Sequence, residues 1–353
     1  MYPRLFAAIA STLLASGCAI HPVPEDVTGL RTEDIVKQIR CETRDAARTM
    51  IRDKLEDLGR RNDEMAAALA VKYKNDPELM VAFDAKKLFP GAENLQIRNY
   101  FEIIYATAIA YAFELQMTET NNLNPSTSKF LGPWSPSLNL DIGGSGDRQR
   151  TNVRTFTITD ELKFLLTDLN TENRSGRYCD NRIVGPNYIY PMAGKIGVYN
   201  TLHTFLQLSL IEHLAPDRSK AFGKDPSPLA DKLQFTTEVS LSATPTVTFA
   251  PVRSQFQITS TTATGKLSRK DMHQVILGLA VDSSAIPALT SMRDFIFSGP
   301  PAVQPGAARL RRRDTQPSEL RSVIAPVTSR AAEIALRMVD QIRSREIQLI
   351  PPP

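Results

Sequence analysis

Asp271 and His273 form the candidate polar site of this sequence, because a single residue separates them in a segment with strand character. Side chains two positions apart on a strand point to the same face of the sheet. An aspartate beside a histidine can bind a metal ion or relay a proton. The sequence shows no third ligand, so we assign no metal, cofactor or catalytic residue, and an ordinary structural pair is the alternative.

The glycine-rich segment 143–146 is the other place where catalytic chemistry is conceivable. It is not followed by the Lys-Ser/Thr pair of a phosphate-binding loop. Asp147 also stands where the last glycine of the Gly-x-Ser-x-Gly hydrolase turn is required. We therefore predict a hairpin turn here, and His203 and His213 fall near the apolar face of a predicted helix, which is typical of structural histidines.

The first eighteen residues resemble the signal peptide of bacterial lipoproteins. Arg4 precedes an apolar stretch, 5–14, that is too short to cross a bilayer of about 30 Å, and the small residues 15–17 lead to Cys18. In that family the signal is removed before the cysteine, a diacylglyceryl group is attached to its sulfur, and the new amino group is acylated. The resemblance implies that Cys18 anchors the mature protein lastingly to a membrane. An ordinary secretory signal cut nearby is the alternative.

The same resemblance implies a location in the cell envelope, facing the periplasm. Ala19 follows the cysteine, in place of the aspartate that retains some bacterial lipoproteins in the inner membrane, so the outer membrane is favoured. The formal net charge of +4 becomes +3 when Arg4 leaves with the signal. Such a mild charge does not indicate nucleic acid as a partner, and the expected partners are the membrane and another envelope protein.

Once Cys18 is assigned to lipid, Cys41 and Cys179 are the cysteines left to pair. Disulfides persist in an oxidising envelope. Cys41 also falls on the charged side of a predicted helix, where an unpaired thiol would be unusual because cysteine normally prefers burial. We expect a disulfide between Cys41 and Cys179, with two separate thiols as the alternative. Closing so long a loop contributes at most roughly 5 kcal/mol in the chain-entropy model.

Apolar residues that recur with a period near 3.6 predict several helices. The charged face of the first predicted helix is expected to be solvated over a core. The predicted helices cover residues 32–58, 63–74, 77–87, 160–169, 196–214 and 329–345.

Alternation of large and small or polar residues predicts strands. In segment 105–120 large residues alternate with alanine, which suits a sheet with a core on one side and a closely packed element on the other. Short turn signals between the strands favour antiparallel pairing. The further predicted strands are 138–142 and 153–159, expected to form a hairpin, and 233–241, 246–249, 255–259 and 273–281, and they form one sheet or two.

The sequence thus predicts an α+β fold: an antiparallel sheet of about six to seven strands packed with long amphipathic helices. The expected order is signal peptide 1–17, tether 18–29, α+β domain 30–298, Pro/Arg-rich linker 299–327, and C-terminal helix and tail 328–353. We expect a lipid-anchored binding or assembly factor without catalytic activity at the membrane surface. The alternative is an envelope hydrolase acting on lipid, glycan or peptide.

Overall fold

The protein is represented by a computed structural model of the whole chain. It describes residues 22–24, 29–132, 135–140, 146–172, 176–188, 190–212, 214, 226–243, 246–248, 257–298 and 329–349. The predicted signal peptide, Cys18, most of the predicted tether, the turn 143–145 and the predicted linker 299–327 lie outside the described residues. Among the described helices, none combines the length and hydropathy needed to cross a bilayer.

The helices agree with the sequence periodicity at most positions. The predictions for 32–58 and 63–74 are confirmed, and α9 was not predicted. The main helices are α3 (Thr32–Arg60), α4 (Glu64–Asn75), α6 (Leu95–Tyr105), α8 (Val198–Leu210), α9 (Ile286–Ser298) and α10 (Arg330–Leu349). The short ones are η1 (Pro77–Ala82), α5 (Ala85–Leu88), η2 (Ala92–Asn94), α7 (Leu162–Thr167), η3 (Pro191–Ala193) and η4 (Ser283–Ala285).

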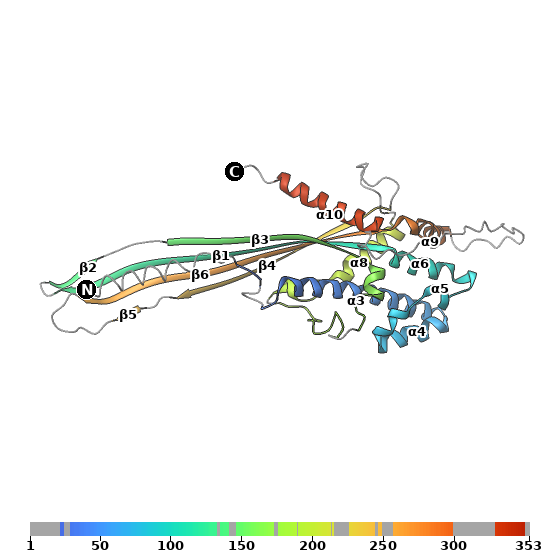
Figure 1. Cartoon of the computed structure of the whole chain (residues 1–353), viewed down its shortest axis with the longest axis horizontal. Coiled ribbons are helices and arrows are strands. Elements are labelled where there is room, and N and C mark those ends of the chain that lie inside the picture. Colours follow the sequence, from blue (N-terminus) through green and yellow to red (C-terminus); the bar gives the residue numbers. More distant parts are fainter. Residues whose placement is uncertain are drawn as a thin grey trace, which may run out of the picture.

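One antiparallel sheet unites the two predicted strand blocks, so the fold is α+β. Its main strands lie in the order β3-β1-β6-β4, with short β2 and β5 beside the far ends of β1 and β6. The long strands project well beyond the helices in Figure 1. Their bounds are β1 (Thr107–Gly132), β2 (Ser135–Leu140), β3 (Gly146–Glu161), β4 (Leu229–Ala243), β5 (Thr246–Thr248) and β6 (Gln257–Val281).

The predicted hairpin between 138–142 and 153–159 is wrong. Strands β2 and β3 both pair with β1, and they follow one another along the same side of it. This is possible because β1 continues for 26 residues, long enough to accept two strands in succession. Residues 257–259 of the predicted strand 255–259 and the predicted strand 273–281 likewise belong to a single strand of 25 residues, β6. Residues 255 and 256 lie outside the described residues. The section of β6 between the two predicted strands is rich in polar residues, so a hydrophobic pattern does not predict that the strand is continuous.

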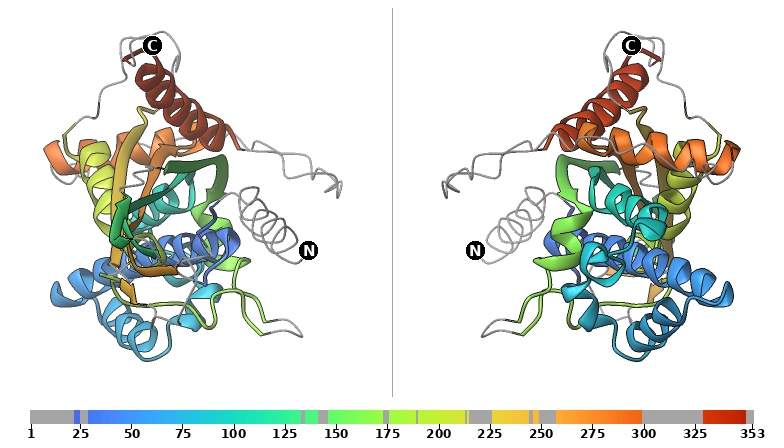
Figure 2. Two further views of the ribbon diagram at one scale, coloured as in Figure 1. Left: turned by 90° about the vertical axis from the view of Figure 1, so that its left-hand side faces the viewer. Right: turned by 90° about the vertical axis from the view of Figure 1, so that its right-hand side faces the viewer.

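The two faces of β1 are covered as its alternating pattern predicted. The large side chains Ile109, Tyr111 and Phe113 are buried in the main core, to which α3, α6, α8 and α9 contribute. The alanines between them, such as Ala110, pack on the opposite face against α10. Figure 2 shows α10 on one side of the sheet and α3 and α4 on the other. Gly278 on β6 permits this close approach, because a Cβ there would lie 2.5 Å from the carbonyl oxygen of Ala335.

The charged face of α3 is buried in part, whereas the whole face was expected to be solvated: Arg52, Asp53 and Glu56 keep side-chain exposures of 32%, 42% and 41%. Arg44 and Arg48 are only 2% and 5% exposed, and both form ion pairs with Glu78 at 2.7 and 2.8 Å. Glu78 lies in η1, and Asn170 donates a further hydrogen bond to its carboxylate at 3.1 Å. Burial of the arginines is thus compensated by a shared carboxylate, a pairing that a periodicity pattern does not reveal.

Candidate functional site

The predicted pair lies on β6 with both side chains directed into the protein. Asp271 and His273 are each 2% exposed. Tyr190, from the loop before η3, contacts both: its hydroxyl hydrogen-bonds to His273 Nε2 and lies 3.4 Å from Asp271 Oδ2. Burial lowers the pKa of His273 to about 4, so the imidazole is neutral at pH 7. Its Nδ1 has no hydrogen-bond partner among the described residues.

A row of charged side chains continues from this pair across three strands. Arg269 on β6 donates to Asp271 Oδ1 at 2.9 Å and to Glu119 Oε1 on β1 at 3.2 Å. Arg150 on β3 donates to Glu119 Oε2 at 2.6 Å. Glu119 is the register partner of both arginines, so the strand pairing itself creates the row. Opposite charges at directly paired positions stabilise a sheet.

The row of charged side chains holds the segment that follows Cys18. Arg269 Nη2 donates to the carbonyl oxygen of Val23 at 2.6 Å, and Asn152 Nδ2 on β3 donates to that of Pro22 at 2.8 Å. Pro22 is buried. The folded part was expected to start near residue 30, but residues 22–24 already lie on the sheet. We name this arrangement of Asn152, Arg269, Pro22 and Val23 the tether clamp.

The geometry around Asp271 and His273 is that of a structural pair. The carboxylate is engaged by Arg269, the imidazole by Tyr190, and neither side chain is accessible. Within the described part of the chain, no group of three or more His, Cys, Asp or Glu residues could hold a metal ion. Asp271 and His273 lie on one face of β6, and their contacts with Tyr190 connect the sheet to the loop before η3.

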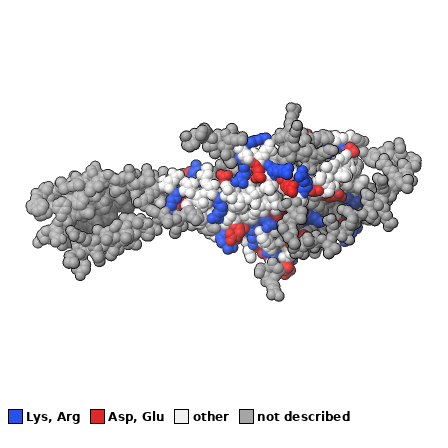
Figure 3. Space-filling view, turned by 45° about the horizontal axis from the view of Figure 1, so that its top comes forward, with Lys and Arg blue, Asp and Glu red and all other residues white. Residues whose placement is uncertain are grey.

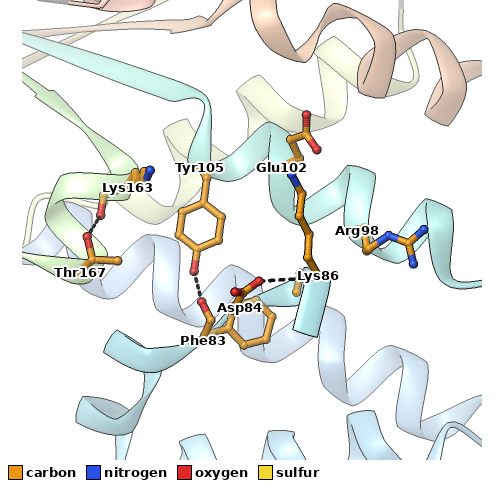
Figure 4. A pocket seen from close by; sticks show the side chains of 9 residues that line it. Phe83, Asp84, Lys86, Arg98, Glu102, Tyr105, Lys163 and Thr167 are labelled. Carbon is orange, nitrogen blue, oxygen red and sulfur yellow. Dashed lines mark hydrogen bonds between the residues drawn. The ribbon is translucent and has the colours of Figure 1, made fainter. Parts of the chain in front are cut away.

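A cavity of about 360 Å³ lies elsewhere, at the end of the helical part near α5, α6 and α7 (Figure 4). Its polar groups are largely bound to the main chain. Tyr105 donates to the carbonyl oxygen of Phe83 at 3.0 Å, and Thr167 donates to that of Lys163 at 2.8 Å. Asp271 and His273 do not line it. The lining residues are Phe83, Asp84, Ala85, Lys86, Arg98, Glu102, Tyr105, Lys163 and Thr167.

The predicted disulfide is present. Cys41 on α3 is bonded to Cys179, with 5.7 Å between the Cα atoms and a sequence separation of 138. Cys41 is completely buried, because the loop that contains Cys179 covers this side of α3. Asn170 accepts the main-chain N–H of Cys179 at 2.7 Å and so orients the loop.

Sequence reasoning missed the residues that complete these arrangements. Glu42 on α3 accepts the main-chain N–H groups of residues 196–198 at 2.7–2.9 Å, which satisfies the N-terminus of α8. Glu119, Arg150 and Arg269 were also missed. Each is a polar residue in a strand, and its partners depend on the strand register, which a polar strand section specifies only weakly.

Comparison with known proteins shows similarity over nearly the whole chain. Residues 21–352 match the family model described as uncharacterised protein y4kA. The chain is 33% identical over 279 residues to uncharacterized protein y4kA of Sinorhizobium fredii (strain NBRC 101917 / NGR234), which covers 78% of this chain and 82% of that protein.

Solved structures give only distant likenesses. The type II secretion system secretin GspD of E. coli K12 is 9% identical, with a TM-score of 0.25 over 63% of this chain and 62% of that chain. The InvG secretin domain from the Salmonella SPI-1 injectisome is 9% identical, with a TM-score of 0.18 over 56% of this chain and 71% of that chain. These TM-scores are too low to carry an argument.

Proposed function

The chain belongs to the y4kA protein family, and on this premise we propose that it is a lipid-anchored cell-envelope protein that acts as a non-catalytic binding or assembly factor at the membrane surface. The resemblance of residues 1–18 to a lipoprotein signal peptide supports the anchor. The disulfide between Cys41 and Cys179 supports an oxidising compartment. The outer membrane is favoured over the inner membrane because Ala19 follows Cys18.

The tether clamp is the observation that carries the proposal. Pro22 follows Cys18 by four residues, which span at most about 14 Å when fully extended. A lipid on Cys18 would therefore lie close to the point where Asn152 and Arg269 hold the chain to the sheet. A protein on a long free tether can rotate relative to the membrane. Here the segment between Cys18 and the tether clamp is short, so a lipid on Cys18 would restrain the orientation of the sheet relative to the membrane. Such restraint suits a protein that presents a surface to partners.

Binding is favoured over hydrolysis by the environment of the titratable groups. Hydrolysis requires a nucleophile or water within reach of a base and of substrate. Asp271 and His273 are 2% exposed and engaged by Arg269 and Tyr190, so this pair gives the hydrolase alternative no support. Positive and negative side chains are interspersed over the described part of the face in Figure 3.

Mass spectrometry of the mature N-terminus tests the anchor. We expect the chain to begin at acylated Cys18 and to sediment with outer-membrane fractions after membranes are separated by density. Cys18→Ser removes the sulfur that would carry the lipid and should release the protein from membranes. Ala19→Ser leaves the cysteine in place and is the matched control. A mature chain that begins elsewhere or lacks acyl groups would contradict the proposal.

A further inference from the structure

We propose that the partner in assembly is a second copy of this chain, and that β3 of one copy pairs antiparallel with β4 of the next. The docking surfaces are the outer sides of these two strands, which we name the β3 edge (Gly146–Glu161) and the β4 edge (Leu229–Ala243). The choice of this pairing rests on the proposed function, because the lipid anchor sets the orientation of the copies.

Both edges are long and regular. In the described part of the chain β3 pairs with β1 and β4 with β6, and neither strand has a partner strand on its outer side. They contain 16 and 15 residues, whereas a strand of about 5–6 residues is typical. Proteins usually protect sheet edges with short strands, bulges, proline or charged side chains. The register of β3 on β1 and of β4 on β6 is continuous, and neither strand contains proline.

The directions of the edge strands select how two copies fit. The main sheet has four antiparallel strands, so β3 and β4 run in opposite directions. Two copies that stand side by side in the same orientation therefore bring a β3 edge and a β4 edge together as an antiparallel pair, which continues the alternation of the sheet. Antiparallel pairing of two β3 edges would require one copy to be inverted.

The lipid anchor favours the same orientation for both copies. The tether clamp lies on β3 and β6, so each copy holds its N-terminal segment at the same height on the sheet. Inverting one copy would carry its anchor away from the membrane that holds the other. A β3-to-β4 contact is heterologous, and contacts of this type build closed rings or open chains of copies.

The side chains along the edges are compatible with pairing. Two charged side chains on the core face of β3 are paired within the chain: Arg150 pairs with Glu119, and Asp160 pairs with Arg40 at 2.6 Å. Val153 on β3 and Val239 on β4 are each about half exposed, at 50% and 51%. The exposed side chains of the opposite face are mostly uncharged and suit cross-strand contacts between hydroxyl and amide groups. They are Gln149, Thr151, Val153 and Thr155 on β3, and Lys232, Gln234, Thr236, Glu238 and Ser240 on β4.

Disulfide cross-linking of the full-length protein, purified from membranes in detergent, tests the pairing. One preparation carries Thr155→Cys on β3. A second preparation, with a tag of different size, carries a single cysteine on β4 at one of three positions: Gln234→Cys, Thr236→Cys or Glu238→Cys. All four positions are on the same face of the sheet. Through Glu114 and Gln274, Gln234 is level with Thr155, and the other two positions on β4 follow it at every second residue.

We expect mild oxidation of the mixture to give a cross-linked pair that contains one copy of each kind, strongest for one of the three β4 positions. When either preparation is oxidised by itself, the yield of cross-linked pair should be at least tenfold lower than in the mixture. In that case only one of the two strands that meet at the contact, β3 or β4, carries an introduced cysteine. Efficient cross-linking of Thr155→Cys with itself would overturn the proposal, as would the absence of mixed pairs at all three positions.

A second variant distinguishes loss of the β4 contact from misfolding of the protein. Gln234→Lys with Thr236→Lys places two added charges beside Lys232 on the exposed face of β4, without changing the core. It should lower the mass of the wild-type oligomer, measured by light scattering, while the Cys41–Cys179 bond still forms. An unchanged oligomer would count against the β4 edge. The intact mass of the same samples reports acyl groups at Cys18, so a missing lipid and a missing contact are separate results.

Discussion

Arg269 on β6 donates a hydrogen bond from Nη2 to the carbonyl oxygen of Val23, 2.6 Å away and 246 positions earlier in the chain. The same guanidinium also binds Asp271 and Glu119, so the N-terminal segment is held by a side chain that is itself fixed in the sheet. A buried arginine bound to two carboxylates has little freedom to move, because leaving both of them would bury its charge without compensation.

Weakening the tether clamp should free the N-terminal segment without unfolding the protein. Asn152→Ala removes the hydrogen bond to Pro22, worth about 1 kcal/mol, so protease cleavage after Glu25 should accelerate about fivefold. Thr151→Ala, on the other face of the same strand, is the matched control. Mass spectrometry measures the cleavage rates of wild type, Asn152→Ala and Thr151→Ala. Equal rates for both variants and wild type would show that the clamp does not restrain this segment.

Removing the disulfide should lower stability by an amount set mainly by loop length. Cys41→Ala with Cys179→Ala opens a bond that spans 138 positions, and we expect a loss of about 3–5 kcal/mol in the free energy of unfolding. Urea unfolding of oxidised wild type, reduced wild type and the double variant measures this. Reduced wild type is the control for the substitutions themselves. A midpoint that does not move on reduction would refute the prediction.

Glu78 should stabilise the fold at neutral pH and lose this effect in acid. Burial alone raises the pKa of Glu78, but the hydrogen bonds and charges of Arg48 and Arg44 lower it more, so its pKa lies well below the usual value. A lowered pKa gives stability that is present above the unfolded pKa of about 4.3 and is lost as the pH falls.

Glu78→Gln leaves two buried guanidinium groups without a carboxylate and should cost about 3 kcal/mol at pH 7. Glu64→Gln, at an exposed position in the first turn of α4, is the control. Chemical unfolding at pH 7 and at pH 3 measures both variants. The Glu78→Gln deficit should shrink at pH 3, and a deficit that stays constant would contradict the assigned ion pairs.

His273 should make the fold sensitive to mild acid. Its pKa is lowered to about 4 by burial, compared with about 6.5 in an unfolded chain. The unfolded state therefore takes up the proton first, and the free energy of unfolding should fall by about 3 kcal/mol between pH 7 and pH 4 from this residue. His273→Gln should remove that part of the slope, and His203→Gln on the exposed side of α8 is the matched substitution. An unchanged slope would show that His273 does not titrate in this way.

Gly278 should be required for the close packing of α10 on the sheet. A Cβ at this position would lie 2.5 Å from the carbonyl oxygen of Ala335 and 2.7 Å from Val339 Cγ2. Gly278→Ala should therefore cost about 1–3 kcal/mol through overpacking. At Gly185 a Cβ would meet nothing within 4 Å, so Gly185→Ala should change stability by less than about 0.5 kcal/mol. Thermal unfolding of the two variants measures the loss of stability in each. Equal losses for Gly278→Ala and Gly185→Ala would argue against the close contact between Gly278 and α10.

Local patterns predicted much of the architecture because they report local burial. The 3.6-residue period over 32–58 predicted α3, and alternation in 105–120 predicted the start of β1 and a packed element behind its alanines, which is α10. The pattern failed where polar residues continue a strand, as in the middle of β6, because a polar segment gives no hydrophobic alternation although its residues pair with β1.

The sequence by itself determined the helical and strand periods, the signal-peptide resemblance that points to Cys18, and the pairing of Cys41 with Cys179. Only the tertiary structure decided that Glu119 lies between Arg150 and Arg269, that Glu78 covers the arginines of α3, and that Val23 is held to the sheet. The physical reason is that these contacts join residues from 30 to 246 positions apart. Their geometry depends on the register of polar strand sections, which the hydrophobic pattern specifies only weakly, and on the packing of elements that are distant in the sequence.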